Sequence, residues 1–143
     1  MNGISCKIEI PAQIRRGDSC PLTFTLENGG TYQAHILTWS TPLEGILGRI
    51  FRVTRDGIEC QYRGPLVKRG APTAEDYVTL QPGESISATV DLKLAYALNE
   101  TGIYEIAYIS GLKDVAFEAE PFPREDVRPA KLDCGVVKFK IVD

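Results

Sequence analysis

The side chains that could do chemistry are few in this sequence and lie far apart. The single histidine, His35, lies within an apolar run and beside no nucleophile motif. Helices of zinc proteases need two histidines, and a Ser-His-Asp triad needs one histidine beside its partners. The motifs G-x-S-x-G, G-x-x-x-x-G-K-[ST] and G-x-G-x-x-G do not occur. We therefore interpret His35 as a hydrogen-bonded histidine of a sheet, and we predict no enzyme activity, no cofactor and no metal site.

Four cysteines stand at wide spacings, at Cys6, Cys20, Cys60 and Cys134. No C-x-x-C pair is present, which excludes zinc ribbons and dithiol redox motifs. The first three fall on the apolar phase of predicted strands, where a free cysteine packs as a small hydrophobe. We predict reduced thiols in the core. In an exported protein a bridge between Cys6 and Cys20 is the alternative.

Composition narrows the functional classes further. The chain has 143 residues, a formal net charge of −3 and a pI near 5.2. Its lysines and arginines are scattered, which is untypical of a nucleic-acid-binding surface. No apolar run is long enough to span a membrane. The N-terminus lacks the features of a signal peptide, so we expect a cytosolic protein, or an exported one whose leader has been removed. The sequence sets no oligomeric state.

Alternation of polar and apolar residues predicts mostly β-strands. The expected strands are residues 4–10, 20–27, 32–39, 50–54, 58–62, 77–80, 85–92, 103–109 and 135–142. Asp56 and Gly57 have the composition of a two-residue type I′ hairpin turn. Residues 93–98 are expected to form one helical turn, and residues 111–133, which are rich in proline and acidic side chains, a long irregular connection.

These elements predict one all-β domain over residues 1–143. Seven to nine short strands with hairpin signals and one short helical turn favour an antiparallel β-sandwich of immunoglobulin-like architecture. Tyr104 follows Gly102 at the start of a late strand, as in a tyrosine corner. An ordinary strand tyrosine explains the same residues, and both interpretations stay open.

The segment 64–77 interrupts this pattern. Two prolines fix φ within it, two glycines permit unusual backbone angles, and Lys68 and Arg69 lie between them. It is either a presented loop that enters a partner's cleft or a cover that protects a sheet edge from pairing. We predict partner contacts from Gly64, Pro65, Leu66, Val67, Lys68, Arg69, Gly70, Ala71, Pro72, Thr73, Glu75, Asp76 and Tyr77.

Four segments carry a resemblance to a known family. They are TPLEG at 41–45, FRVTRDG at 51–57, YRGPLVKRGAPTAEDY at 62–77 and LQPGES at 80–85. Together they resemble the N-terminal, propeptide-like domain of bacterial deuterolysin-type (aspzincin) zinc metallopeptidases. The segment 62–77 is the most specific part of the resemblance.

In that family the region precedes a catalytic domain with an H-E-x-x-H motif, which this sequence lacks. The resemblance therefore implies a non-catalytic relative that inhibits or chaperones a zinc metallopeptidase of the deuterolysin type. Some relatives favour lysine in their substrates, so Lys68 is expected to enter a specificity pocket. The alternative is an immunoglobulin-like interaction or adhesion module that binds another protein or a glycan.

Overall fold

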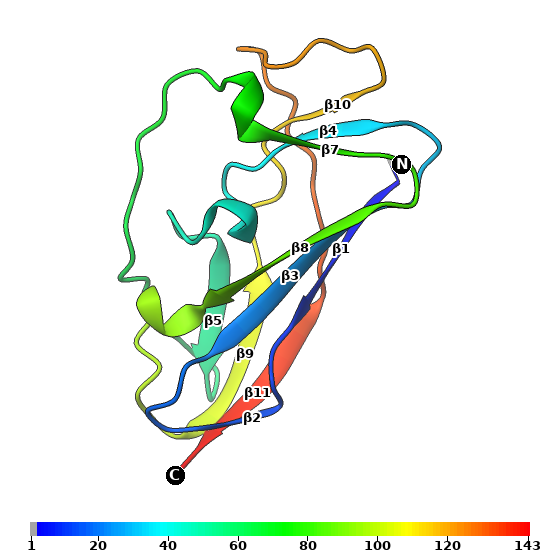
Figure 1. Cartoon of the computed structure of the whole chain (residues 1–143). Coiled ribbons are helices and arrows are strands. Elements are labelled where there is room, and N and C mark those ends of the chain that lie inside the picture. The colour runs from blue at the N-terminus through cyan, green and yellow to red at the C-terminus, as the bar shows by residue number, and fades with distance from the viewer. Residues whose placement is uncertain (1–2) are drawn as a thin grey trace.

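The computed structural model describes residues 3–143, and most of its regular structure is β-strand (Figure 1). Eleven strands lie in the described residues: β1 (Ile4–Glu9), β2 (Gln13–Arg15), β3 (Pro21–Asn28), β4 (Ala34–Leu37), β5 (Phe51–Arg55), β6 (Ile58–Glu59), β7 (Tyr77–Leu80), β8 (Ser85–Asp91), β9 (Gly102–Tyr108), β10 (Val115–Phe117) and β11 (Val136–Val142). Single turns of 3-10 helix form η1 (Pro42–Glu44), η2 (Ala74–Asp76) and η3 (Leu92–Leu94). Met1 and Asn2 of the predicted domain lie outside the described residues.

Two of the sheets face each other as the layers of a sandwich. One layer is the three-stranded sheet β1-β3-β8, and the other is the five-stranded sheet β2-β11-β9-β5-β6. Figure 1 shows the first layer in front of the second, with the third sheet, β10-β4-β7, at the upper end. All strand pairs are antiparallel except β2 with β11. The chain is an all-β, immunoglobulin-like β-sandwich, which confirms the predicted fold class.

The core between the layers is made by the apolar phase of the alternating strands. Leu22, Phe24 and Leu26 of β3 are fully buried, as is Ile106 of β9 in the opposite layer. The rings of Phe24 and Tyr108 lie 5.3 Å apart across the sandwich. Full burial of one such side chain stabilises the fold by about 1.5–3 kcal/mol. One hydrophobic cluster contains residues of all three sheets, while the assignment of residues 1–143 to one domain stays a prediction.

Two local features follow the sequence closely. Asp56 and Gly57 both have positive φ, 49° and 86°, as a type I′ turn between β5 and β6 requires. The Tyr104 hydroxyl donates to the carbonyl of Glu100, four residues earlier, at 2.7 Å. This bond settles the open question about Tyr104 in favour of a tyrosine corner.

Other details differ from the expectations. The described residues contain eleven strands and not seven to nine. The additional strands include β2 and β10 at sheet edges, and their three residues each are too few to show a polar–apolar alternation. β10 lies inside the expected irregular connection, and its residue Ala116 pairs with His35 of β4. Three helical turns replace the single expected one, and η3 covers only the start of the predicted helical segment.

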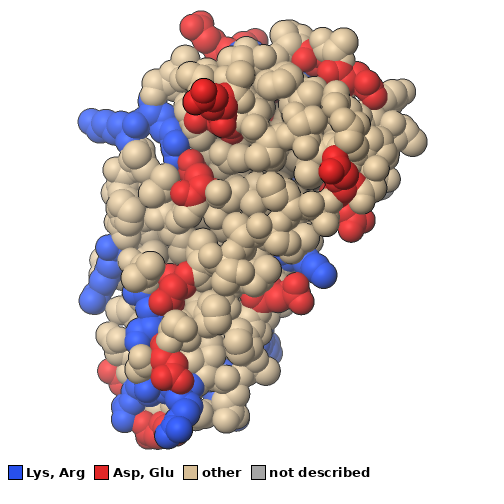
Figure 2. All heavy atoms as spheres, in the orientation of Figure 1, with Lys and Arg blue, Asp and Glu red and all other residues tan. Residues whose placement is uncertain are grey.

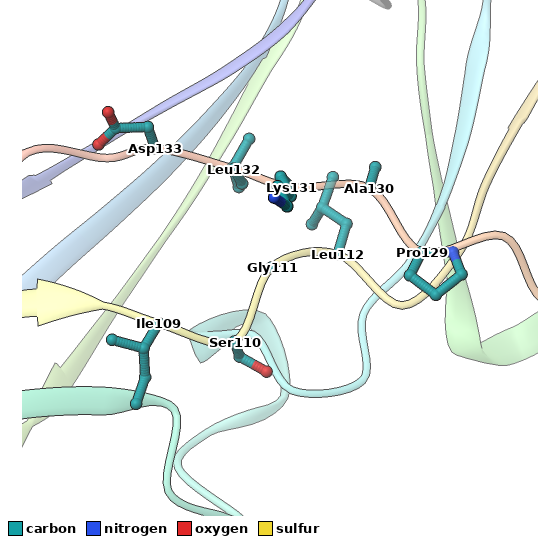
Figure 3. Close-up of a pocket in the computed structure, with 9 residues that line it drawn as sticks. All are labelled: Ile109, Ser110, Gly111, Leu112, Pro129, Ala130, Lys131, Leu132 and Asp133. Atoms are coloured by element: carbon teal, nitrogen blue, oxygen red, sulfur yellow. The ribbon is translucent and has the colours of Figure 1, made fainter.

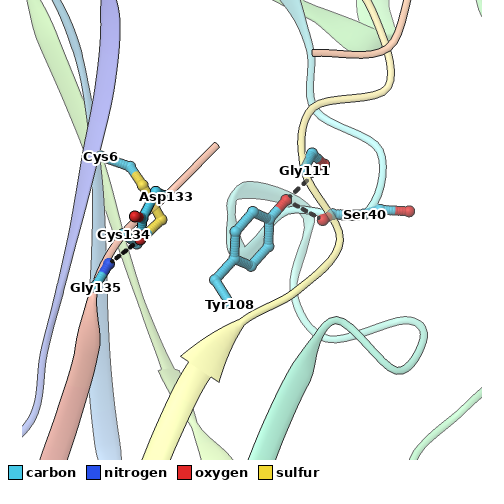
Figure 4. The surroundings of a disulfide bond; sticks show 7 residues. All are labelled: Cys6, Ser40, Tyr108, Gly111, Asp133, Cys134 and Gly135. Carbon is cyan, nitrogen blue, oxygen red and sulfur yellow. Dashed lines mark hydrogen bonds between the residues drawn. A yellow bond between two sulfur atoms is a disulfide. The ribbon is translucent and has the colours of Figure 1, made fainter. Parts of the chain in front are cut away.

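The predicted state of two cysteines is wrong. Cys6 of β1 and Cys134 form a disulfide, with Cα atoms 5.0 Å apart (Figure 4). The alternative bridge to Cys20 is wrong too. Cys134 lies two residues before the start of β11, so the disulfide joins the two facing layers. The reason is tertiary: only the packed sandwich brings these residues together across a sequence separation of 128.

Cys20 and Cys60 are free thiols, as predicted. Burial, followed by the charge of Asp91, raises the pKa of the Cys20 thiol to about 11. Burial also raises the pKa of the Cys60 thiol. Both thiols therefore stay protonated and unreactive near neutral pH.

Candidate functional site

The predicted loop leaves β6 and crosses one side of the sandwich before it reaches η2 (Figure 1). At its start the Arg63 amide donates to the carbonyl of Ala95 at 2.7 Å. The Tyr62 hydroxyl donates to the carbonyl of Pro65 and closes a tight turn. A Cβ atom on Gly64 would lie 2.5 Å from that hydroxyl oxygen, so a larger residue would displace the Tyr62 ring and its hydrogen bond. The first turn of the loop is therefore fixed by its own side chains.

Arg69 fastens the middle of the loop to the body of the protein. Its guanidinium donates to both carboxylate oxygens of Glu44, at 2.5 and 2.6 Å, and lies over the Trp39 ring, 4.8 Å from the centroid. The Ser40 amide donates to the same carboxylate at 2.8 Å. The side chains of Arg69 and Glu44 are only 26% and 13% exposed. A guanidinium that donates from Nη2 to both carboxylate oxygens and also stacks on an indole ring holds its segment in one orientation.

The C-terminal end of the loop is also fixed by hydrogen bonds. Thr73 and Asp76 form a capping box around η2, in which the Thr73 amide donates to the Asp76 carboxylate at 2.8 Å. The Asp76 carbonyl accepts from the amide and the hydroxyl of Thr38, at 2.9 and 3.0 Å. Tyr77 then enters the interior as the first residue of β7. Both ends and the middle of the loop are thus anchored.

A buried carboxylate lies where the loop joins β7. Asp114 is fully buried and accepts from the Tyr77 hydroxyl at 2.6 Å. Arg124 donates to it at 2.7–3.1 Å, and the Arg128 amide donates at 2.9 Å. Burial disfavours the charged form, but the hydrogen bonds of Arg124 and Tyr77 outweigh it and hold the pKa of Asp114 below its ordinary value. The desolvated Tyr77 hydroxyl, bonded to this carboxylate, has its pKa raised to about 12.

The anchors leave a short exposed tip, Pro65 to Lys68. Leu66 is 78% exposed and Val67 48% exposed, although large apolar side chains are usually buried. Within residues 3–143, Lys68 makes no hydrogen bond or ion pair. Of the remaining predicted contact residues, Gly64, Pro72 and Asp76 are half-buried and Tyr77 is buried, while Gly70, Ala71, Thr73 and Glu75 are exposed.

Two hollows flank the tip. One, of about 330 Å³, is lined by Trp39, Leu47 and the inner side of Leu66 and Val67, with Lys113 at its wall. The other, of about 420 Å³, lies between Ile46, Pro65, Val90 and Leu94. Both are mainly apolar. The tip is therefore an apolar ridge with one free ammonium group, and apolar hollows lie on either side of it.

A third hollow is lined by no residue of the loop. It has a volume of about 570 Å³ and lies between residues 109–112 and 129–133 (Figure 3). Its titratable side chains are Lys131 and Asp133. Beside it the Tyr108 hydroxyl donates to the carbonyls of Ser40 and Gly111, at 2.6 and 2.8 Å (Figure 4). These bonds give Tyr108 a structural role.

The other candidate residues are structural in the described part of the chain. His35 is buried, shares a hydrogen bond with the Thr79 hydroxyl at 2.8 Å and contacts the Glu118 carbonyl at 3.2 Å. Its ring stacks on Phe122 at 4.0 Å. The interpretation of His35 as a satisfied sheet histidine is confirmed. Among residues 3–143 no group of three His, Cys, Asp or Glu side chains could hold a metal ion.

Sequence reasoning missed the side chains that hold the loop. Glu44, Trp39 and Asp114 contact loop residues that lie far away in the chain, so no local sequence pattern indicated these contacts. We expect Arg69→Ala to increase cleavage of the loop by thermolysin, because Leu66 and Val67 lose their support. The free energy of unfolding should fall by less than about 1 kcal/mol, since the ion pair is partly exposed.

Arg69→Lys is the matched variant, since it keeps the charge but loses the planar guanidinium that stacks on Trp39. Its loop should be cut at an intermediate rate. Equal cleavage rates in all three proteins would show that the Arg69 contacts do not order the loop.

Comparison with known proteins relates part of the chain to a protease. The chain is 33% identical over 92 residues to an extracellular protease of Aeromonas hydrophila; the match covers 64% of this chain and 26% of that protein. The chain thus spans about a quarter of the length of that relative. No family model matches the chain. The similarity to part of a protease agrees with the coarser part of the predicted resemblance, and the deuterolysin-type assignment stays a prediction.

Solved structures resemble the chain only in outline. An Escherichia coli alpha-2-macroglobulin fragment aligns with a TM-score of 0.47 and 15% identity, over 97% of this chain and 16% of that one. A CARDB domain from Pyrococcus furiosus aligns with a TM-score of 0.39 and 13% identity, over 97% and 92% of the two chains.

No helix among residues 3–143 is long and apolar enough to cross a membrane.

Proposed function

We propose that this chain is a non-catalytic β-domain that binds a deuterolysin-type zinc metallopeptidase, as an inhibitor or a pro-domain-like chaperone. The observation that carries the proposal is the exposed tip of Pro65 to Lys68 on an otherwise anchored loop. A loop ordered before binding loses little conformational entropy when it enters a cleft. The partial match to an extracellular protease supports a peptidase as the partner.

The tip supplies contacts of a defined kind. Leu66 and Val67 offer apolar area to a partner, and Lys68 offers an exposed ammonium that no group of the described chain neutralises. Arg69 is already engaged by Glu44 and Trp39, so its role is to hold the tip. We assign partner contact to Leu66, Val67 and Lys68 and positioning to Arg69.

The test measures casein cleavage by a purified deuterolysin-type metallopeptidase with increasing amounts of this protein. Wild-type protein should inhibit cleavage, and Leu66→Asp should raise the inhibition constant at least about tenfold, as expected for loss of a central apolar contact. Ile58→Asp is the control, because Ile58 is 71% exposed but lies in the β5–β6 hairpin. It should inhibit like the wild type.

Lys68→Ala separates the two halves of the contact. A weaker inhibitor would support entry of Lys68 into a specificity pocket, whereas unchanged inhibition would remove that role and leave the apolar contact. A refolding assay of the denatured peptidase, with and without this protein, tests the chaperone function. If wild-type protein affects neither cleavage nor refolding, the proposed function is wrong.

A further inference from the structure

The sheet β1-β3-β8 has two edges of different character. β8, with seven residues, forms one edge and pairs only with β3. From Ser85 to Val90 it carries no charged residue and no proline. Natural edge strands usually carry charged residues or proline, or are very short, because these features keep other strands from pairing with the edge. β8 therefore lacks the protective residues of most edge strands, although η1 contacts it and Ile46 and Pro65 lie across a hollow from its residues Thr89 and Val90.

The register shows which main-chain groups of β8 point outward. The Asn28 amide donates to the Glu84 carbonyl at 2.9 Å, and the Leu92 amide donates to the Cys20 carbonyl at 3.0 Å. These bonds place the hydrogen-bonded pairs at the even-numbered residues of β8. The main-chain groups of the odd-numbered residues Ser85, Ser87 and Thr89 therefore point away from β3. No other segment of residues 3–143 hydrogen-bonds to them.

The two faces of β8 specify what could pair with it. On the outer face the hydroxyls of Thr89 and Ser87 pair with those of Thr23 and Thr25 on β3, at 2.9 and 2.8 Å. The inner-face residues Ile86, Ala88 and Val90 are only half-buried. The surface over β8 is largely uncharged in Figure 2. A matching strand needs hydroxyls on one face, small apolar residues on the other and no charge.

β8 itself has this pattern. In an antiparallel pair of two β8 strands, hydroxyl residues face hydroxyl residues and apolar residues face apolar residues. No like charges from residues 85–90 meet at the centre of the pair. The other edge, β1, carries Lys7 and Glu9 and is bridged at Cys6 to Cys134. Growth of the sheet would therefore stop after one pairing, as in a closed twofold dimer.

We propose that β8 is a dimerisation edge, where two copies of this chain pair antiparallel through the main chains of Ser85, Ser87 and Thr89. The pairing joins the two three-stranded sheets into one continuous sheet. It also covers the half-buried side chains of Ile86 and Val90. The pairing uses no main-chain group of the loop tip, although Pro65 lines a hollow with Thr89 and Val90, and the proposal does not depend on the proposed function.

Sedimentation equilibrium of the purified protein at increasing concentration tests the proposal. The average mass should rise from 15.8 kDa toward twice that value. Amide exchange at Ser85, Ser87 and Thr89 should slow in parallel with dimer formation. A mass that stays at 15.8 kDa up to the solubility limit would overturn the proposal. So would a dimer in which amide exchange slows on association at other residues and not at Ser85, Ser87 and Thr89.

Two variants locate the contact. Ser87→Pro removes an outward amide that β3 does not use, so the monomer should fold while dimerisation is lost. Ser87→Lys brings like charges together across the pair, because Ser87 faces Ser87 of the other copy, and it tests the interface if Ser87→Pro fails to fold. Ser87→Ala keeps the amide and should dimerise normally. Ser5→Lys places the same charge on β1 and should have no effect. A folded Ser87→Lys protein that still dimerises like the wild type would place the interface elsewhere.

Discussion

Asp114→Ala is expected to lower the free energy of unfolding by about 3–5 kcal/mol, since it breaks a buried ion pair by removing one partner. Arg124, whose side chain is only 14% exposed, would lose its carboxylate partner. The buried hydroxyl of Tyr77 would also lose its acceptor. Urea unfolding measures the change. Asp126→Ala, at an exposed position of the same connection, is the control and should leave stability nearly unchanged.

The pH dependence gives a second readout of the same carboxylate. Because its pKa is lower in the folded protein than the ordinary 3.8, ionised Asp114 adds stability that is fully present above that value. This stability is lost as the pH falls through the lower, folded-state pKa. The stability difference between wild type and Asp114→Asn should therefore be constant near neutral pH and shrink in strong acid. A difference that grows on acidification would contradict the assigned role.

Removal of the Cys6–Cys134 disulfide is expected to lower the free energy of unfolding by about 4–5 kcal/mol, the range for a closed loop of about a hundred residues. The bridge spans a sequence separation of 128 and restricts the unfolded chain strongly. The double variant Cys6→Ser, Cys134→Ser should therefore unfold at a lower urea concentration than the wild type.

Dithiothreitol provides the internal comparison. It should lower the urea midpoint of unfolding of the wild type to that of the double variant, and it should not change the midpoint of the double variant. Cys60→Ser removes a free thiol and should respond to the reductant like the wild type. If the double variant and the oxidised wild type share one midpoint, the disulfide adds no stability.

Local patterns were sufficient to predict most of the fold. The hairpin at Asp56 and Gly57 follows from the backbone angles that the turn requires, and the long strands β3, β8 and β9 follow from period-two alternation. The tyrosine corner could be named as a candidate because its hydrogen bond runs only four residues back, to Glu100. These features depend on neighbours in the chain, which a single sequence displays.

The features that escaped prediction join distant residues. Glu44, which binds the Arg69 guanidinium, lies 25 residues away in the chain. Asp114, which accepts the hydrogen bond of Tyr77, lies 37 residues away. The position of the 64–77 loop was predicted, but not which of its side chains are held and which are free. Only packing decides that Arg69 is engaged while Leu66 and Lys68 stay exposed.

The Cys6–Cys134 disulfide also determines what a single peptide-bond cleavage does to the molecule. All of residues 7–133 lie between Cys6 and Cys134, and so does the exposed tip at Leu66. A peptidase that cleaved the tip would therefore leave two pieces joined by a covalent bond and by the intact strand pairs. Such a nicked molecule runs as one band in gel electrophoresis without reductant and as two bands with it. A partner that cuts the tip would therefore not separate the protein into two molecules.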